Sequence, residues 1–207
     1  MEKIKNFFKE VARAVVRFIV LVYCRIIYRV KIIGKENIPK DGALIFCGNH
    51  RTYLDPPLII VTAGRHIRFI AKEELKKNPL FAVLGVLFEG IFVKRDAKDI
   101  SAMKESIKTL KNKGAIGIFP EGTRNGFEKN DGKVKNGAAY MALKTGAKVL
   151  PIAVVGPSKP FTKNAIIYGK PIDFSEYAKD KKIEKEAEDE VSEIIKQEIL
   201  KLCETKI

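Results

Sequence analysis

Residues 43–63 read ALIFCGNHRTYLDPPLIIVTA and contain three parts of different character. Ala43–Cys47 is an apolar run of strand length, and Asn49–Asp55 is a polar loop. Pro56–Ala63 is apolar again, and its leading proline suits the first turn of a helix. The stretch therefore predicts a buried strand, a loop and a short helix, which is the repeating unit of an α/β fold.

The same alternation continues on both sides of this unit. Further strands are predicted at Val30–Ile33, Ile67–Ala71, Ile91–Val93, Ala115–Phe119, Val149–Val155 and Ile166–Tyr168. Further helices are predicted at Pro79–Phe88, Lys98–Lys113, Asn136–Lys144 and Glu184–Cys203, the last within a charged segment at 176–205.

Two of these segments carry more specific expectations. Pro79–Phe88 is apolar and should be a buried helix. Pro151 interrupts Val149–Val155, so that strand should lie near a sheet edge or begin after the proline. The whole pattern predicts a single α/β domain at 30–207, with a mostly parallel central sheet flanked by helices.

Composition limits the class of protein. The chain has 207 residues, 46% of them hydrophobic, which excludes general disorder. Cys24, Cys47 and Cys203 are scattered and form no CxxC pair, which favours a reducing compartment over a disulfide framework. The only histidines are His50 and His66, too few for a zinc cluster, so no metal site is expected.

The net charge of +14 is unevenly distributed. Residues 173–207 hold eleven acids and seven lysines, so the other 172 residues carry +18. A body this basic attracts anions: nucleic acid, an anionic lipid surface or a phosphorylated substrate.

Residues 1–29 predict a basic amphipathic helix. Its lysines and arginines recur every four residues, at Lys5, Lys9, Arg13 and Arg17. Its apolar residues follow helical spacing, at Ile4, Phe7, Phe8, Val11, Val15, Phe18, Ile19, Val22 and Ile26. The longest uncharged run, Phe18–Cys24, is seven residues, whereas a membrane span needs about 20. The segment lacks the features of a signal peptide. It suits the membrane interface; the alternative is that its apolar face packs on the domain.

His50 and Asp55 form the first candidate site. A carboxylate five residues after a histidine can hydrogen-bond the imidazole if the loop curls back, leaving the other ring nitrogen free to accept a proton. Two structural interpretations remain open. Asp55 before Pro56 also fits a helix N-cap, and His50 can be an ordinary loop residue.

The second candidate site is the loop Glu121-Gly122-Thr123-Arg124, which follows a predicted strand. An arginine in such a loop can bind phosphate with its guanidinium and nearby backbone N–H groups; alone, the segment also fits an ordinary turn. Lys94 and Arg95 end the segment GIFVKR, and strand alternation allows one of them at most to point into the same site.

Together these three segments resemble the glycerolipid acyltransferase family, and most closely the 1-acylglycerol-3-phosphate O-acyltransferases. The family's HxxxxD block matches NHRTYLDP, its arginine block matches GIFVKR at Arg95, and its EGTR block matches FPEGTRN. A looser block resembles Val149–Ala153. The resemblance covers roughly residues 30–170. Other signatures are absent from the sequence, including GxxxxGK[ST], GxGxxG and GxSxG.

The resemblance implies an activity and a role for each residue. An acyl thioester, on coenzyme A or acyl carrier protein, is the donor, and lysophosphatidic acid is the acceptor. His50 is the general base, and Asp55 holds it. Arg124 and Arg95, with Lys94, bind the acceptor phosphate. Gly122 and Thr123 let the backbone approach the phosphate, and Glu121 orients the loop. No cofactor is expected, and the enzyme is expected on the cytoplasmic face of the cell membrane as a peripheral or monotopic protein.

Three alternatives stay open. The acceptor can be glycerol 3-phosphate or another lysophospholipid, or the chain can be a basic binding module without chemistry. Nucleic acid is not an expected partner, because the basic residues are not interleaved with stacking aromatics. Cys47 is expected to be a small core residue rather than a nucleophile.

Overall fold

A computed structural model describes residues 2–94, 100–129, 132–178 and 183–207. Its centre is a seven-stranded sheet in the order β1-β7-β6-β2-β5-β3-β4. The strands are β1 (Val30–Ile33), β2 (Leu44–Gly48), β3 (Arg68–Lys72), β4 (Ile91–Val93), β5 (Ala115–Ile118), β6 (Lys148–Val155) and β7 (Asn164–Tyr168). β6 and β7 pair antiparallel, and the other neighbours in this described sheet are parallel. The predicted mostly parallel α/β sheet is confirmed.

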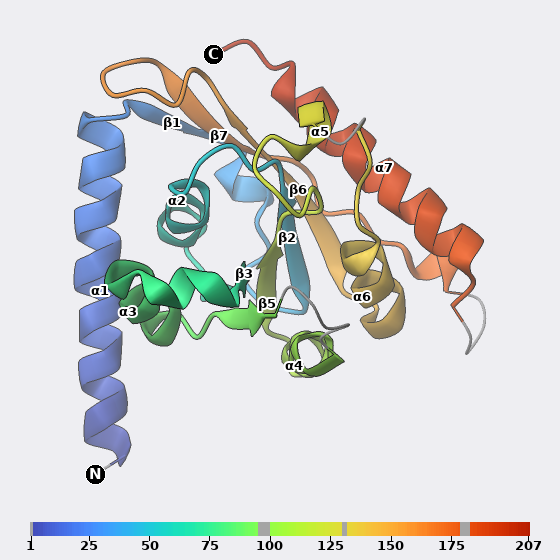
Figure 1. The fold of residues 1–207 in the computed structure, drawn as a ribbon, viewed down its shortest axis with the longest axis horizontal. Coiled ribbons are helices and arrows are strands. Elements are labelled where there is room, and N and C mark those ends of the chain that lie inside the picture. The colour runs from blue at the N-terminus through green and yellow to red at the C-terminus, as the bar shows by residue number, and fades with distance from the viewer. Residues whose placement is uncertain (1, 95–99, 130–131, 179–182) are drawn as a thin grey trace.

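Helices cover both faces of the sheet (Figure 1). One layer holds α1 (Glu2–Ile26), α2 (Asp55–Thr62) and α3 (Pro79–Leu87), and the other holds α4 (Ile100–Lys111), α6 (Gly137–Thr145) and α7 (Lys185–Cys203). Shorter helical segments are η1 (Lys35–Asn37), η2 (Glu73–Lys77), α5 (Gly126–Lys129) and η3 (Ser175–Tyr177). Along β2, Leu44 and Phe46 pack toward the first layer and Ile45 and Cys47 toward the second, as strand alternation requires.

The prediction that the strand with Pro151 lies near a sheet edge or begins after the proline is wrong. This strand, β6, begins at Lys148 and lies between β2 and β7. The β6–β7 ladder begins only at the residue after Pro151, Ile152, opposite Tyr168, and the preceding contact is an isolated bridge between Val149 and Ile172. Pro151 occupies the gap between these pairings, where its carbonyl accepts from Gly169 N (2.9 Å). The ladder therefore does not need the N–H that proline lacks.

The prediction at Pro79–Phe88 is right about a helix but wrong about its burial. α3 begins at Pro79 and ends at Leu87, and none of its nine residues is buried. Only Phe88, the residue after it, joins the core.

α1 carries most of its large apolar side chains outward, while Cys24 is buried in the core and Val16 and Val20 pack against it. The alternative that this face packs on the domain is wrong, because the exposed large side chains of α1 are Ile4, Phe7, Phe8, Val11, Val15, Phe18, Ile19, Val22, Tyr23 and Ile26. Its inward side is partly basic. Arg13 is 6% exposed, and Arg17 lies 5.7 Å from the Phe88 ring centroid. The side chain of Lys5 lies outside the described residues. In the part of the chain that the structure describes, no helix has the length and apolarity to cross a bilayer.

Glu89 attaches α1 to the sheet layer. Its Oε1 accepts from Lys9 Nζ (2.5 Å) and Arg13 Nη2 (2.9 Å), while Arg13 Nε donates to the Leu87 carbonyl (2.7 Å). The hydrogen bond from Lys9 is the main cause that lowers the pKa of the Glu89 carboxyl to about 2. Two basic residues that the sequence assigned to an anionic surface thus have a protein partner instead.

Candidate active site

The sheet topology brings the two motif loops together. β2 and β5 are neighbouring parallel strands, with Cys47 opposite Ile118. Their carboxyl ends therefore lie side by side at one edge of the sheet, where open α/β sheets bind ligands. The loop after β2 carries His50, and the loop after β5 carries Glu121 and Arg124.

His50 and Asp55 form the predicted pair. The distance from His50 Nδ1 to Asp55 Oδ2 is 2.8 Å. An ionised carboxylate can only accept a hydrogen bond, so Nδ1 is the donor in this pair, and in the neutral imidazole Nε2 is then the ring nitrogen with the free lone pair. The other contacts of the Asp55 carboxylate are all acceptor contacts, as an ionised group requires. The arrangement leaves Nε2 able to accept a proton.

Asp55 organises the loop but does not cap the helix. Leu54 is the N-cap of α2, and Asp55 is its first residue. The Asp55 carboxylate instead accepts from Arg51 N (2.6 Å), Thr52 N (2.7 Å) and Thr52 Oγ1 (2.9 Å). A physical reason is that Pro56 and Pro57 supply no N–H to cap, and the next N–H, that of Leu58, bonds the Leu54 carbonyl.

Glu121 joins the two loops at His50. Its Oε1 accepts from His50 N (2.6 Å), and its Oε2 accepts from Phe127 N (2.9 Å). The return contact runs from Asn125 N to the His50 carbonyl (2.6 Å). Glu121 is 3% exposed, and this burial raises the pKa of its carboxyl, an effect that backbone N–H groups oppose. The Glu121 carboxylate thus links the two loops, and its role in orienting them for a substrate stays a prediction.

One face of the His50 ring is covered. The ring stacks on Phe119 with centroids 4.2 Å apart and an angle of 12° between planes. Phe119 in turn lies 5.5 Å from the Phe69 ring. The His50 side chain is 18% exposed. The ring is thus fixed by an aromatic contact on its face and by Asp55 at Nδ1.

Arg124 points to the His50 loop. Its Cζ lies 3.9 Å from the centroid of the Tyr53 ring, a cation–π contact. Tyr53 follows His50 by three residues, and its ring lies 5.6 Å from that of Phe81 in α3. Arg124 is exposed. Its guanidinium is therefore held beside the histidine loop with its N–H donors accessible to a ligand.

The remaining predicted residues differ in how the structure places them. Gly122 has a φ of +66°, which favours glycine, and its N–H donates to the Phe119 carbonyl (3.1 Å). That N–H is therefore engaged, although Gly122 was expected to bring the backbone to a phosphate. Thr123 is half-buried beside Arg124. Lys94 is exposed after β4, three strands from β2. Arg95 lies outside the described residues.

Sequence analysis missed three residues that shape the site. Asn49, 8% exposed, donates from Nδ2 to the Val154 carbonyl (3.0 Å) and accepts from Val154 N (2.7 Å). It ties the histidine loop to β6, while Phe119 and Tyr53 make the ring contacts described above. Their only signal was position, since each stands within or directly beside a motif block.

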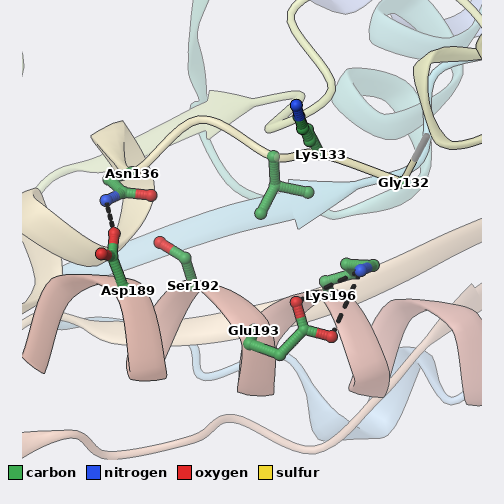
Figure 2. Close-up of a pocket in the computed structure, with 8 residues that line it drawn as sticks. Gly132, Lys133, Asn136, Asp189, Ser192, Glu193 and Lys196 are labelled. Atoms are coloured by element: carbon green, nitrogen blue, oxygen red, sulfur yellow. Dashed lines mark hydrogen bonds and ion pairs between the residues drawn. The ribbon is translucent and has the colours of Figure 1, made fainter. Parts of the chain in front are cut away.

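Two further features do not belong to this site. Cys47 is fully buried, and burial raises the pKa of its thiol, which argues against a nucleophile. A cavity of about 320 Å³ lies between the loop at 132–136 and α7 (Figure 2). Its lining includes Lys133, Asp189 and Ser192 but none of the predicted catalytic residues.

Comparison with known proteins identifies the class. The family model described as Acyltransferase matches residues 29–155, which include both motif loops. The chain belongs to the acyltransferase family, as its three motifs predicted.

Its relatives make the class more specific. The chain is 37% identical over 141 residues to the 1-acyl-sn-glycerol-3-phosphate acyltransferase of Borreliella burgdorferi, covering 67% of this chain and 56% of that protein. It is 31% identical over 159 residues to the enzyme of the same name from Bacillus subtilis, covering 72% and 76%. The chain thus spans little more than half of the first relative.

A solved structure is similar over nearly the whole chain. It is the 1-acyl-sn-glycerophosphate (LPA) acyltransferase PlsC from Thermotoga maritima, with a TM-score of 0.68 and 28% identity. The match covers 98% of this chain and 84% of that one.

Proposed function

We propose that this protein transfers an acyl chain from an acyl thioester to the sn-2 hydroxyl of lysophosphatidic acid, which yields phosphatidic acid for phospholipid synthesis. The observation that carries the proposal is the hydrogen bond of 2.8 Å between His50 Nδ1 and Asp55 Oδ2, beside a loop that presents Arg124. The printed names of the Borreliella and Bacillus relatives support the choice of acceptor.

His50 acts as the general base in this proposal. Nε2 takes the proton of the acceptor hydroxyl while its oxygen attacks the thioester carbonyl. The ionised Asp55 stabilises the imidazolium that results. When the tetrahedral intermediate collapses, the C–S bond breaks and the imidazolium returns its proton to the leaving thiolate. No covalent acyl-enzyme is needed.

Arg124 binds the acceptor phosphate. An arginine offers a planar set of N–H donors that fits phosphate oxygens in pairs. We propose that Arg95, with Lys94, assists in binding this phosphate, as the family's arginine block implies. Thr123 borders the phosphate, while Gly122 shapes the turn. Holding the phosphate fixes the hydroxyl near Nε2, and such positioning accounts for much of the rate in two-substrate reactions.

The outward face of α1 places the enzyme on its lipid substrate. Phe7, Phe8 and Phe18 are each between 65% and 68% exposed, unusual for aromatic side chains in water. We propose that α1 lies in the cytoplasmic leaflet of the cell membrane as a peripheral or monotopic element. The net charge of +14 favours an anionic leaflet.

The test is an acceptor panel with purified protein. Long-chain acyl-CoA or acyl carrier protein is supplied with lysophosphatidic acid, glycerol 3-phosphate or lysophosphatidylcholine, and the lipid product is identified by mass. The proposal predicts phosphatidic acid from lysophosphatidic acid. A product from another acceptor alone would contradict the substrate assignment, and no product at all would favour a binding module.

The surface assignment has its own test. Replacing Phe7 and Phe18 of α1 with Gln should weaken binding to vesicles of phosphatidylcholine and phosphatidylglycerol by about 10-fold or more. The reason is that two aromatic side chains then no longer enter the bilayer. Unchanged binding would contradict the role of α1 and leave the chemistry intact.

A further inference from the structure

α3 is the least expected element of the structure. Its sequence, PLFAVLGVL, contains no polar side chain. A helix that is apolar all round normally lies in a protein core or in a membrane. In α3, however, Leu80, Val83 and Val86 are 62%, 63% and 74% exposed. Three side chains at a spacing of three residues form one outward stripe of the helix.

α3 lies beside the helix that the proposed function assigns to the membrane. It contacts α1, and Figure 1 shows the two helices on the same side of the sheet. Their exposed apolar residues are hereafter called the α1–α3 surface: on α3 Leu80, Val83 and Val86, and on α1 Ile4, Phe7, Phe8, Val11, Val15, Phe18, Ile19, Val22, Tyr23 and Ile26.

The net charge favours a lipid partner over a second copy of the chain. The chain carries +14, and an anionic leaflet attracts such a charge. A second copy carries the same charge of +14 and repels it.

α3 also touches the candidate active site. The ring centroids of Phe81 and Tyr53 are 5.6 Å apart. The Tyr53 centroid in turn lies 3.9 Å from Cζ of Arg124. A bilayer that meets Leu80, Val83 and Val86 therefore lies near the group that binds the acceptor phosphate. A lysophospholipid in that leaflet can present its headgroup there while its chain stays in lipid.

We propose that α3 is a second membrane-contacting element, in which Leu80, Val83 and Val86 enter an anionic leaflet beside α1. The proposal rests on the proposed function, since it takes the bilayer to be the source of the acceptor. It adds that the enzyme is held at two places, one of which borders the acceptor site.

The chain has no tryptophan, so a single introduced tryptophan reports on one position. Val86→Trp tests α3, and Phe18→Trp tests α1. Ile100→Trp is the matched control, because Ile100 is 62% exposed in α4, in the opposite layer. Each variant is mixed with vesicles of phosphatidylcholine and phosphatidylglycerol, with and without brominated acyl chains.

The proposal predicts that Val86→Trp and Phe18→Trp shift to shorter emission wavelength and are quenched by brominated lipid, whereas Ile100→Trp is not. A shift for Phe18→Trp without one for Val86→Trp overturns the proposal for α3 and leaves the proposed function standing. No shift for either also overturns it. A concentration-dependent shift of Val86→Trp without vesicles assigns the surface to a second copy and overturns it as well.

A loss-of-binding variant completes the test. Replacing Leu80, Val83 and Val86 with Gln, a good helix former, should weaken vesicle binding by about 10-fold or more. Ile100→Gln should leave it unchanged. Circular dichroism verifies the fold, and acyl transfer to micellar lysophosphatidic acid, a readout of the proposed function, should be retained. Unchanged vesicle binding of the folded triple variant contradicts the proposal.

Discussion

The His50 centre and the α1–α3 surface are neighbours built in opposite ways. At the centre, polar groups such as Asp55 and Glu121 are buried and hydrogen-bonded. At the surface, apolar side chains such as Phe18 and Val86 are exposed. Burying polar groups is tolerated only when they have partners, and exposing large apolar patches indicates a partner outside the chain. Turnover and membrane binding should therefore be separable by mutation.

Substitution of Asp55 is expected to give the largest difference between the effect on turnover and the effect on membrane binding. Asp55→Asn removes the charge proposed to stabilise the imidazolium and places an amide NH₂ among donors from Arg51 and Thr52. We expect kcat to fall by about 10²- to 10⁴-fold, with vesicle binding unchanged. Steady-state kinetics and vesicle sedimentation on the same preparation measure both. A loss in sedimentation as large as the loss in kcat would show that the two regions are not separable.

Arg124 should affect substrate binding rather than the chemical step. Arg124→Ala removes the proposed phosphate ligand, and we expect the KM for lysophosphatidic acid to rise by about 10- to 100-fold. Arg124→Lys keeps the charge without the paired donors, so its KM for lysophosphatidic acid should lie between those of wild type and Arg124→Ala. A KM for lysophosphatidic acid that is unchanged in Arg124→Ala would contradict the phosphate assignment.

Glu89 tests the attachment of the surface to the domain. Its pKa of about 2, against a usual 4.5, means that it stabilises the fold above pH 4.5 and that this contribution is lost as the pH falls toward 2. Glu89→Gln should lower the free energy of unfolding by about 1 kcal/mol at neutral pH, a modest value because the site is partly exposed to solvent. Chemical denaturation at pH 7 and pH 3 measures it. If the free energy of unfolding falls by the same amount from pH 7 to pH 3 in wild type and in Glu89→Gln, this role of Glu89 is contradicted.

Tyr53 should give the smallest effect, because it acts through Arg124. Tyr53→Leu removes the ring under the guanidinium, and an exposed cation–π contact contributes about 0.5–1 kcal/mol. The expected rise in the KM for lysophosphatidic acid is about two- to fivefold, with kcat unchanged. Tyr53→Phe keeps the ring and is the matched control. Equal effects of Leu and Phe would indicate a role for the hydroxyl instead of the ring.

Much of the fold followed from local patterns. Apolar runs such as Ala43–Cys47 and Ala115–Phe119 predicted buried parallel strands, and both are central in the sheet. The prediction for Pro151 failed because a proline is accepted inside a strand where the neighbouring strand does not need its N–H. Where β7 begins to pair with β6 decides this, and the sequence of β6 alone does not show it. Pro79–Phe88 misled it because an apolar sequence predicts burial without specifying whether protein or lipid provides it.

The sequence predicted which residues form the candidate site, but not the contacts that hold them in place. The motifs identified His50, Asp55 and the Glu121–Arg124 loop. The contacts of Asn49 with β6 and of Arg124 with Tyr53 join segments far apart in sequence. Such contacts follow from strand order, which one sequence does not give. The same holds for Glu89, whose partners on α1 come from more than 70 residues away.

The most direct test of the central claim is thiol release from long-chain acyl-CoA by wild type and His50→Ala, with and without lysophosphatidic acid, at equal vesicle-bound protein. The account predicts lysophosphatidic-acid-dependent release by wild type and a loss of about 10³-fold or more in His50→Ala, since both the base and its orientation are removed. Dependent release that persists in His50→Ala at near the wild-type rate would contradict it.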